Sequence, residues 1–207
     1  MLLQLSDSAL PTGGFSHSFG LEQYIAREDV HDEESFAQWL RVFVMSQLTH
    51  TDALVIRLSY EGVDEGELAD LVLALTLPAQ VRAADVAMAK RLRAIGQDAL
   101  GVEPTDVEHA HPAWEFARIT RHFAVPVEQA VLAHLFGTVS TLTQNAVRGI
   151  PIGQSAGQRV LTRAHDWVEQ AWREVKSLDL VDLGVVGPGL EIAQMQHERL
   201  RQRMFMS

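Results

Sequence analysis

The sequence contains no cysteine and only two lysines, Lys90 and Lys176, in 207 residues. The lack of cysteine excludes disulfides, thiolate metal sites, iron–sulfur clusters and catalysis by a thiol. It is compatible with a reducing compartment, so we expect a cytoplasmic protein. The amino terminus has no basic region followed by a long apolar run, and we therefore expect no secretory signal peptide.

Basic residues are outnumbered, with 17 Lys and Arg against 27 Asp and Glu, and the formal net charge is −10. This negative charge argues against nucleic acid or an anionic membrane surface as the principal partner. Hydrophobic residues make up 47% of the chain, enough for a core without disulfide or metal support. At this length we expect a single domain that spans residues 1–207.

Strand-forming patterns are nearly absent as well. The one β-rich run, residues 183–187, is too short to build a sheet alone. Elsewhere apolar residues recur at intervals of three and four, as they do after the acidic helix start at residues 32–34. Thr51 and Asp52 are expected to cap a shorter helix that ends at Gly62. We predict an all-α bundle of roughly eight to ten helices.

One predicted helix, residues 129–147, carries no charged side chain. A helix without a charged face is expected to be buried on most sides. One of its faces is a stripe of neutral polar residues, namely His134, Thr138, Thr141 and Asn145. A buried polar stripe needs polar partners or water. It belongs either to a core helix with satisfied hydroxyls or to the wall of a wet passage or subunit interface.

The segment at residues 10–22, LPTGGFSHSFGLE, is too rich in glycine and proline for an ordinary helix and too aromatic for a flexible linker. A serine nucleophile elbow requires G-x-S-x-G, and the second glycine is missing here. The local pattern favours a turn that packs Phe15 and Phe19 into a core. Gly14 is expected to hold a position that a side chain would disturb.

A second glycine-rich segment, residues 149–159, does not match a phosphate-binding loop and follows no strand. We interpret it as a helix break at Pro151 and a restart near Gly153, where glycine is again expected to be required. Three polar residues after the break are available to a partner: Gln154, Gln158 and Arg159.

Histidine is frequent, with nine residues, but His109 and His111 form the only close pair, beside Glu108. Most protein metal sites need at least three ligands, and an H-x-H pair in a loop is a weak match. We therefore expect no metal site and no enzyme. The alternative hypothesis is a metal-dependent hydrolase that uses His109, His111 and Glu108.

The last segment, residues 187–207, differs in charge from the rest of the chain. A hinge at residues 187–189 precedes a helix with an apolar face, and Arg199, Arg201 and Arg203 make its end basic. Chain ends fray unless they dock. This C-terminal docking tail either packs against its own domain or binds a partner.

Three segments together, in this order and near these spacings, resemble the UreF family of urease accessory proteins. They are LPTGGFSHSFGLE at residues 10–22, AVRGIPIGQSAGQR at 146–159 and LEIAQMQHERLRQRMF at 190–205. The resemblance runs from Leu2 to the C-terminus. It is weaker after Pro78, where QVRAAD at residues 80–85 replaces a Ser-Arg-Glu-like polar run of the family.

The resemblance implies an all-α homodimer without catalytic activity that takes part in nickel insertion into apo-urease. Such proteins bind a second accessory protein, UreD or UreH, and recruit the nickel-carrying GTPase UreG into a metallochaperone complex. The family is proposed to modulate that GTPase or to conduct nickel through a tunnel. The complex would then handle nickel transiently, with no tightly bound cofactor.

The resemblance also implies partner-binding residues in all three segments. Residues 10–22 would form a partly exposed, GTPase-facing turn anchored by Phe15 and Phe19, presenting Ser16, His17 and Glu22. The other expected partner-binding residues are Arg148, Gln154, Gln158, Arg159, Glu191, Met195, His197, Arg199 and Arg203. The stripe of His134, Thr138, Thr141 and Asn145 could line a nickel passage.

Overall fold

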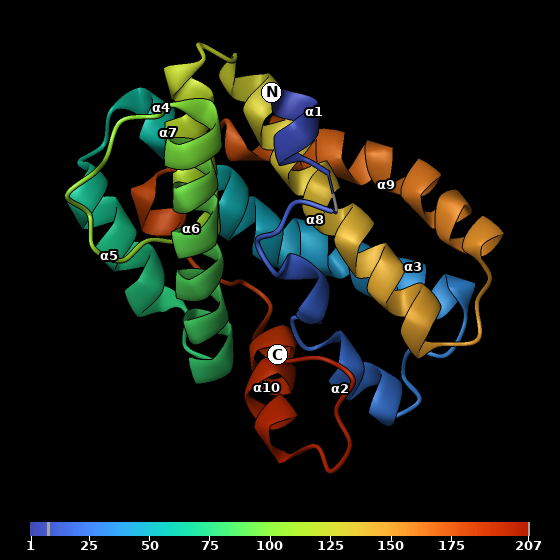
Figure 1. Cartoon of the computed structure of the whole chain (residues 1–207). Helices are drawn as coiled ribbons and strands as arrows, with labels where there is room; N and C mark the ends of the chain where they lie inside the picture. Colours follow the sequence, from blue (N-terminus) through green and yellow to red (C-terminus); the bar gives the residue numbers. More distant parts are fainter. Residues whose placement is uncertain (8, 207) are drawn as a thin grey trace.

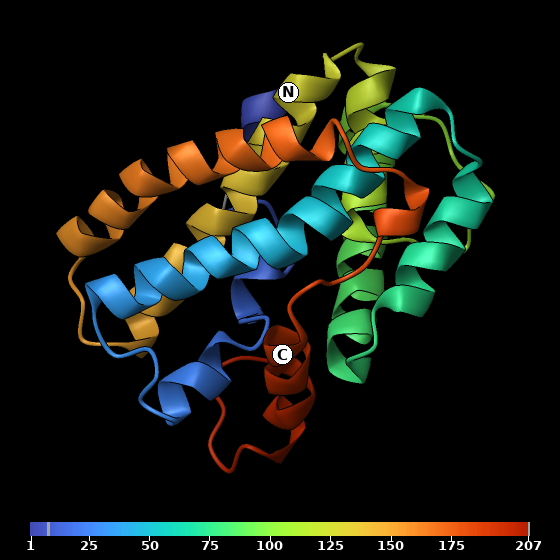
Figure 2. The same cartoon turned by 180° about the vertical axis from the view of Figure 1, so that it is seen from behind.

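The computed structural model describes residues 1–7 and 9–206, and within them it contains helices and loops but no strand (Figures 1 and 2). The predicted all-α fold is confirmed. The α-helices are α1 (Leu2–Leu5), α2 (Leu21–Ala26), α3 (Glu33–Phe43), α4 (Leu54–Glu61), α5 (Glu65–Leu75), α6 (Ala79–Leu100), α7 (Pro112–His122), α8 (Val127–Gly149), α9 (Gln154–Val175) and α10 (Pro188–Gln196). Short 3-10 turns are η1 (Gly14–Ser16), η3 (Leu180–Asp182) and η4 (His197–Arg199), and η2 (Val44–Ala53) is a π-helix.

Helix α8 lies at the centre of the structure, as expected for a helix with an uncharged middle. It packs along α9 and also contacts η2, α4, α7 and the N-terminal elements. Its apolar stripe, including Val131, Leu135, Val139 and Leu142, is fully buried. Burial of such side chains supplies the main favourable free energy of folding.

Helices α3 and α4 form one continuous rod through the π-helical segment η2. The rod begins at Asp32, whose carboxylate accepts a hydrogen bond from the backbone N–H of Ser35 in a capping box. The predicted cap at Thr51 and Asp52 is wrong, because both residues lie inside η2. Asp52 does not bond a helix N-terminus; its carboxylate pairs with His134 of α8.

The C-terminal helix α10 packs against α2 and α6, and both views place it beside α2 (Figures 1 and 2). The tail therefore contacts its own domain, one of the two arrangements expected from its sequence. Its final residue, Ser207, lies outside the described residues. None of the helices in the described part of the chain combines the length and apolarity of a membrane-spanning segment.

Candidate functional site

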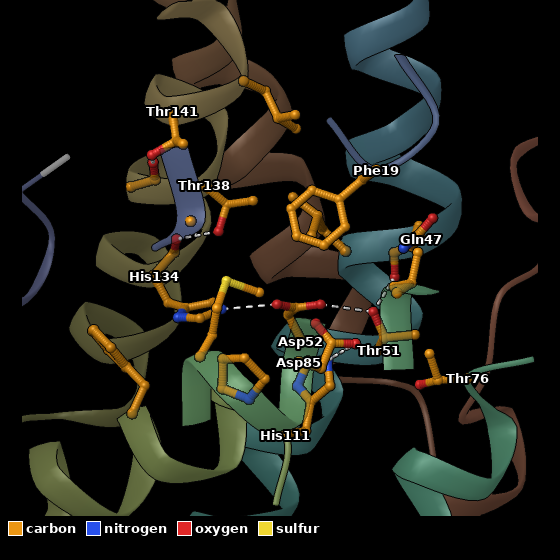
Figure 3. Close-up of a pocket in the computed structure, with 18 of the residues that line it drawn as sticks. Phe19, Gln47, Thr51, Asp52, Thr76, Asp85, His111, His134, Thr138 and Thr141 are labelled. Carbon is orange, nitrogen blue, oxygen red and sulfur yellow. Dashed lines mark hydrogen bonds and ion pairs between the residues drawn. The ribbon is translucent and has the colours of Figure 1, made fainter. Parts of the chain in front are cut away.

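A cavity of about 150 Å³ lies between α6, α8 and η2, with room for several water molecules (Figure 3). Three residues of the predicted polar stripe line it: His134, Thr138 and Thr141. The fourth, Asn145, does not line it. Its side-chain amide donates a 2.8 Å hydrogen bond to the backbone carbonyl of His17 instead. The stripe thus borders the cavity at its middle and the N-terminal turn at its end.

Two aspartate–histidine pairs face the cavity (Figure 3). Nε2 of His134 lies 2.8 Å from Oδ1 of Asp52, and Nε2 of His111 lies 3.6 Å from Oδ2 of Asp85. The backbone N–H of Ala113 donates to Nδ1 of His111, so the neutral tautomer of His111 carries its proton on Nε2, facing Asp85.

The pKa values of the two carboxyl groups are shifted in opposite directions. Burial disfavours the charge on Asp52, but the His134 hydrogen bond and the nearby His111 lower the pKa of Asp52 from 3.8 to about 2. Burial and the charge of Asp52 raise the pKa of Asp85 well above 3.8. Burial also lowers the pKa of His111. The cavity wall therefore holds one carboxyl group that ionises readily, on Asp52, and one that resists ionisation, on Asp85.

Replacement of Asp85 with asparagine should stabilise the protein at pH 7 and change its stability little at pH 3. The unfolded chain releases the Asp85 proton near pH 4, whereas the folded protein retains it to higher pH. The folded state then binds more protons, so this residue makes stability fall as pH rises. Asparagine removes that dependence. Urea unfolding at both pH values measures it, and an equal change at both would contradict the assignment.

The hydrolase alternative receives no support from the placement of its residues. Glu108 and His109 have exposed side chains, and Nε2 of His109 lies 3.8 Å from a carboxylate oxygen of Glu108. His111 is buried and faces Asp85. Among residues 1–7 and 9–206, no three His, Asp or Glu side chains are grouped closely enough to hold a metal ion.

A buried carboxylate joins the C-terminal tail to the N-terminal segment. Glu22 accepts hydrogen bonds from the backbone N–H groups of Met204, at 2.5 Å, and Phe205, at 3.2 Å. Nε2 of His197 lies 2.9 Å from the same carboxylate, and its Nδ1 lies 3.1 Å from the side-chain oxygen of Gln80. Carboxylates that accept several N–H groups make strong hydrogen bonds.

Three of the expected partner-binding residues are buried. His17 and Glu22 are each 5% exposed, and His197 is fully buried. The expectation that His17 and Glu22 are presented on a partly exposed turn is wrong. Glu22 and His197 instead hold the tail against its own domain. Ser16 is partly buried, and its hydroxyl donates to the carbonyl of Gly13.

The exposed part of the predicted surface combines the N-terminal turn with the end of the tail. Phe15 is 55% exposed rather than packed into the core, and Met204 and Met206 are also exposed. Arg148 of α8 donates to the carbonyl of Phe15 and lies over the ring of Phe205, 5.6 Å from its centroid. We call Phe15, Arg148, Met204 and Met206 the turn–tail surface.

The remaining expected partner-binding residues differ in their surroundings. Met195, Arg199 and Arg203 are exposed on the tail, whereas Glu191 is partly buried and lines the cavity. Gln154 and Gln158 are exposed on α9. Arg159 is exposed too, but it forms a bidentate ion pair with Glu33 of α3. Arg159 thus already ties α9 to α3.

Glycine is required at Gly13 and Gly20 rather than at the predicted Gly14 and Gly153. Gly13 has a φ of +88° and Gly20 a φ of +87°, in the left-handed region. A Cβ at Gly13 would also collide with the guanidinium group of Arg91. A Cβ at Gly14 would have no contact shorter than 3.7 Å, and one at Gly153 none within 4 Å. The expectation for Gly14 and Gly153 is therefore wrong.

Comparison with known proteins agrees with the three-segment resemblance. The UreF family profile matches residues 30–165, more than half of the chain. The whole chain is 48% identical to the urease accessory protein UreF of Paenarthrobacter aurescens (strain TC1) and covers 96% of it. For UreF of Geobacillus kaustophilus (strain HTA426), the identity is 41%, over the whole chain and 96% of the relative. The chain therefore belongs to the UreF family of urease accessory proteins.

Proposed function

We propose that this protein is a non-catalytic scaffold for nickel insertion into apo-urease. It acts in the cytoplasm as a homodimer, binds a UreD- or UreH-type accessory protein and recruits the nickel-carrying GTPase UreG. The observation that carries the proposal is the position of Phe15, which is 55% exposed on the turn–tail surface and also lines the polar cavity. A partner bound at this surface would lie at the edge of the cavity.

The turn–tail surface has the composition of a docking site. Exposed methionine and phenylalanine side chains adapt to an apolar partner surface, and arginine is enriched at protein interfaces. Arg199, Arg201 and Arg203 are exposed next to it, in a protein with a net charge of −10. Local positive charge favours a partner with an acidic surface. Recruitment there would position the GTPase or modulate its hydrolysis of GTP.

The cavity provides a route for nickel as cargo. Its wall offers the ionised carboxylate of Asp52, the imidazole of His134 and the hydroxyls of nearby threonines. Imidazole and oxygen groups suit divalent nickel. The described residues offer no three-ligand cluster, so the ion would be in transit rather than tightly bound.

The double replacement Thr138→Val and Thr141→Val tests the passage. Both hydroxyls donate to carbonyls of their own helix, at 3.1 Å to His134 and 3.0 Å to Gly137. Their loss should therefore change stability by less than about 1 kcal/mol. We expect normal co-purification with UreH and UreG, but several-fold lower urease activation at limiting nickel, restored by excess nickel.

The matched control is Thr143→Val. Thr143 lies on the same helix and bonds its own backbone in the same way, at 2.8 Å to Val139, but it is buried away from the cavity lining. Activation by this control should equal that of the unmodified protein. Full urease activation by the double variant at limiting nickel would contradict the nickel passage. If the unmodified protein co-purifies with neither UreH nor UreG, the scaffold proposal is contradicted.

A further inference from the structure

One side of the cavity is covered by residues 10–16, which we call the strap. Leu10, Thr12, Gly14 and Phe15 of this segment line the cavity. Figure 1 shows the chain between α1 and α2, in blue, passing between α6 and α8 toward α10. The only regular structure in the strap is the three-residue turn η1. Its position therefore depends on contacts from other elements.

Three elements hold the strap through its backbone carbonyl groups. Arg91 of α6 donates to the carbonyl of Thr12 at 3.0 Å, and Arg148 of α8 donates to that of Phe15 at 2.9 Å. The backbone N–H of Met206, in the tail, donates to the carbonyl of Ser16 at 2.7 Å. These are few bonds for a segment of this length, and each can be removed without changing a residue of the strap.

The tail contributes to two of these three contacts. Met206 bonds Ser16 directly, and the neighbouring Phe205 packs under the guanidinium of Arg148. The tail end is itself fixed by Glu22, which accepts the N–H groups of Met204 and Phe205. Displacement of the tail end would thus break one bond to the strap and remove the Phe205 ring from Arg148, the source of a second, which would keep only its hydrogen bonds to Phe15 and Asn145.

We propose that the strap is a lid over the cavity and that the C-terminal tail holds it closed. A partner that binds the exposed side chains of Met204 and Met206 and shifts Phe205 and the Met206 N–H away from the strap opens the cavity to solvent and to cargo. This proposal depends on the proposed function only for the identity of the cargo. Access to the cavity can be measured without nickel, GTPase or urease.

Cysteine labelling measures this access, because the natural chain has no cysteine. Thr138→Cys places one thiol in the cavity wall of the full-length protein. We expect a small methanethiosulfonate reagent to label it about tenfold faster when Phe205→Ala is added, because this change removes the buried ring that anchors the tail end and its contact with the guanidinium of Arg148. Arg91→Ala should have a similar effect with the tail in place.

Three controls separate lid opening from loosening of the whole protein. Thr143→Cys reports on a buried position outside the cavity, and Gln158→Cys reports on an exposed one. Neither rate should change with Phe205→Ala, and Arg201→Ala in the tail should leave the Thr138→Cys rate unchanged. Equal Thr138→Cys rates in all backgrounds, or an equal rise at Thr143→Cys, would overturn the lid. Neither result would affect the scaffold proposal, which co-purification and urease activation test separately.

Discussion

Replacement of Glu115 with alanine should lower the free energy of unfolding by about 3–5 kcal/mol, a large share of the stability of an ordinary domain. Glu115 lies on α7 and is fully buried. Its carboxylate pairs with the guanidinium groups of Arg93 on α6 and Arg118, the latter at 2.9 Å. Their side chains are only 18% and 11% exposed. Alanine would leave both positive charges largely buried without a counter-charge.

Urea denaturation followed by circular dichroism measures this change, and Glu65→Ala is the matched control. Glu65 forms an ion pair with Arg121 of the same helix α7, at 3.0 Å, but both side chains are more than one-third exposed. Exposed pairs contribute about 0–1 kcal/mol, so the control should unfold almost normally. A loss for Glu115→Ala no larger than that of the control would show that the Glu115 ion pairs add little stability.

The fold could be predicted from the sequence because helix periodicity is a local property. The uncharged helix predicted at residues 129–147 is α8, Val127–Gly149, and its apolar stripe is buried as expected. The helix cap predicted at Thr51 and Asp52 is wrong because Asp52 has a tertiary partner. Asp52 pairs with His134, which lies 82 residues away, and the surrounding segment is π-helical. The local sequence does not distinguish an aspartate that caps a helix from one that lines a cavity.

The candidate site could be predicted only in part. Helical spacing placed Thr138 and Thr141 on one face, and both line the cavity. The same spacing included Asn145, but this end of α8 meets the N-terminal turn rather than the cavity. Asp85 was missed as a cavity residue, although it is a lone acidic residue on an otherwise apolar helix face. Such a residue signals burial but does not identify its partner.

The bond between the tail and the N-terminal segment had no local signal at all. Glu22 and His197 are 175 residues apart, and the sequence around neither residue identifies its partner. A carboxylate in an exposed turn and one that satisfies backbone N–H groups differ only in their tertiary neighbours. The sequence therefore predicted where the tail begins but not what holds it.

Replacement of Glu22 with alanine should release the tail and abolish partner binding while the helical core remains folded. The substitution leaves the imidazole of His197 and the N–H groups of Met204 and Phe205 without the carboxylate they share. Each buried donor without an acceptor is unfavourable by about 1–3 kcal/mol. Detachment of the tail exposes these donors to water, so the released state becomes the more stable one.

Limited trypsin digestion and co-purification provide the two measurements. We expect cleavage after Arg199, Arg201 or Arg203 to be at least about tenfold faster in Glu22→Ala, since proteolysis follows the population of the open form. UreH and UreG should no longer co-purify, because the turn–tail surface has lost Met204 and Met206. Glu198→Ala, an exposed carboxylate in the tail, should behave like the unmodified protein. Faster cleavage with normal co-purification would show that the partners bind elsewhere, and unchanged cleavage would show that Glu22 does not hold the tail.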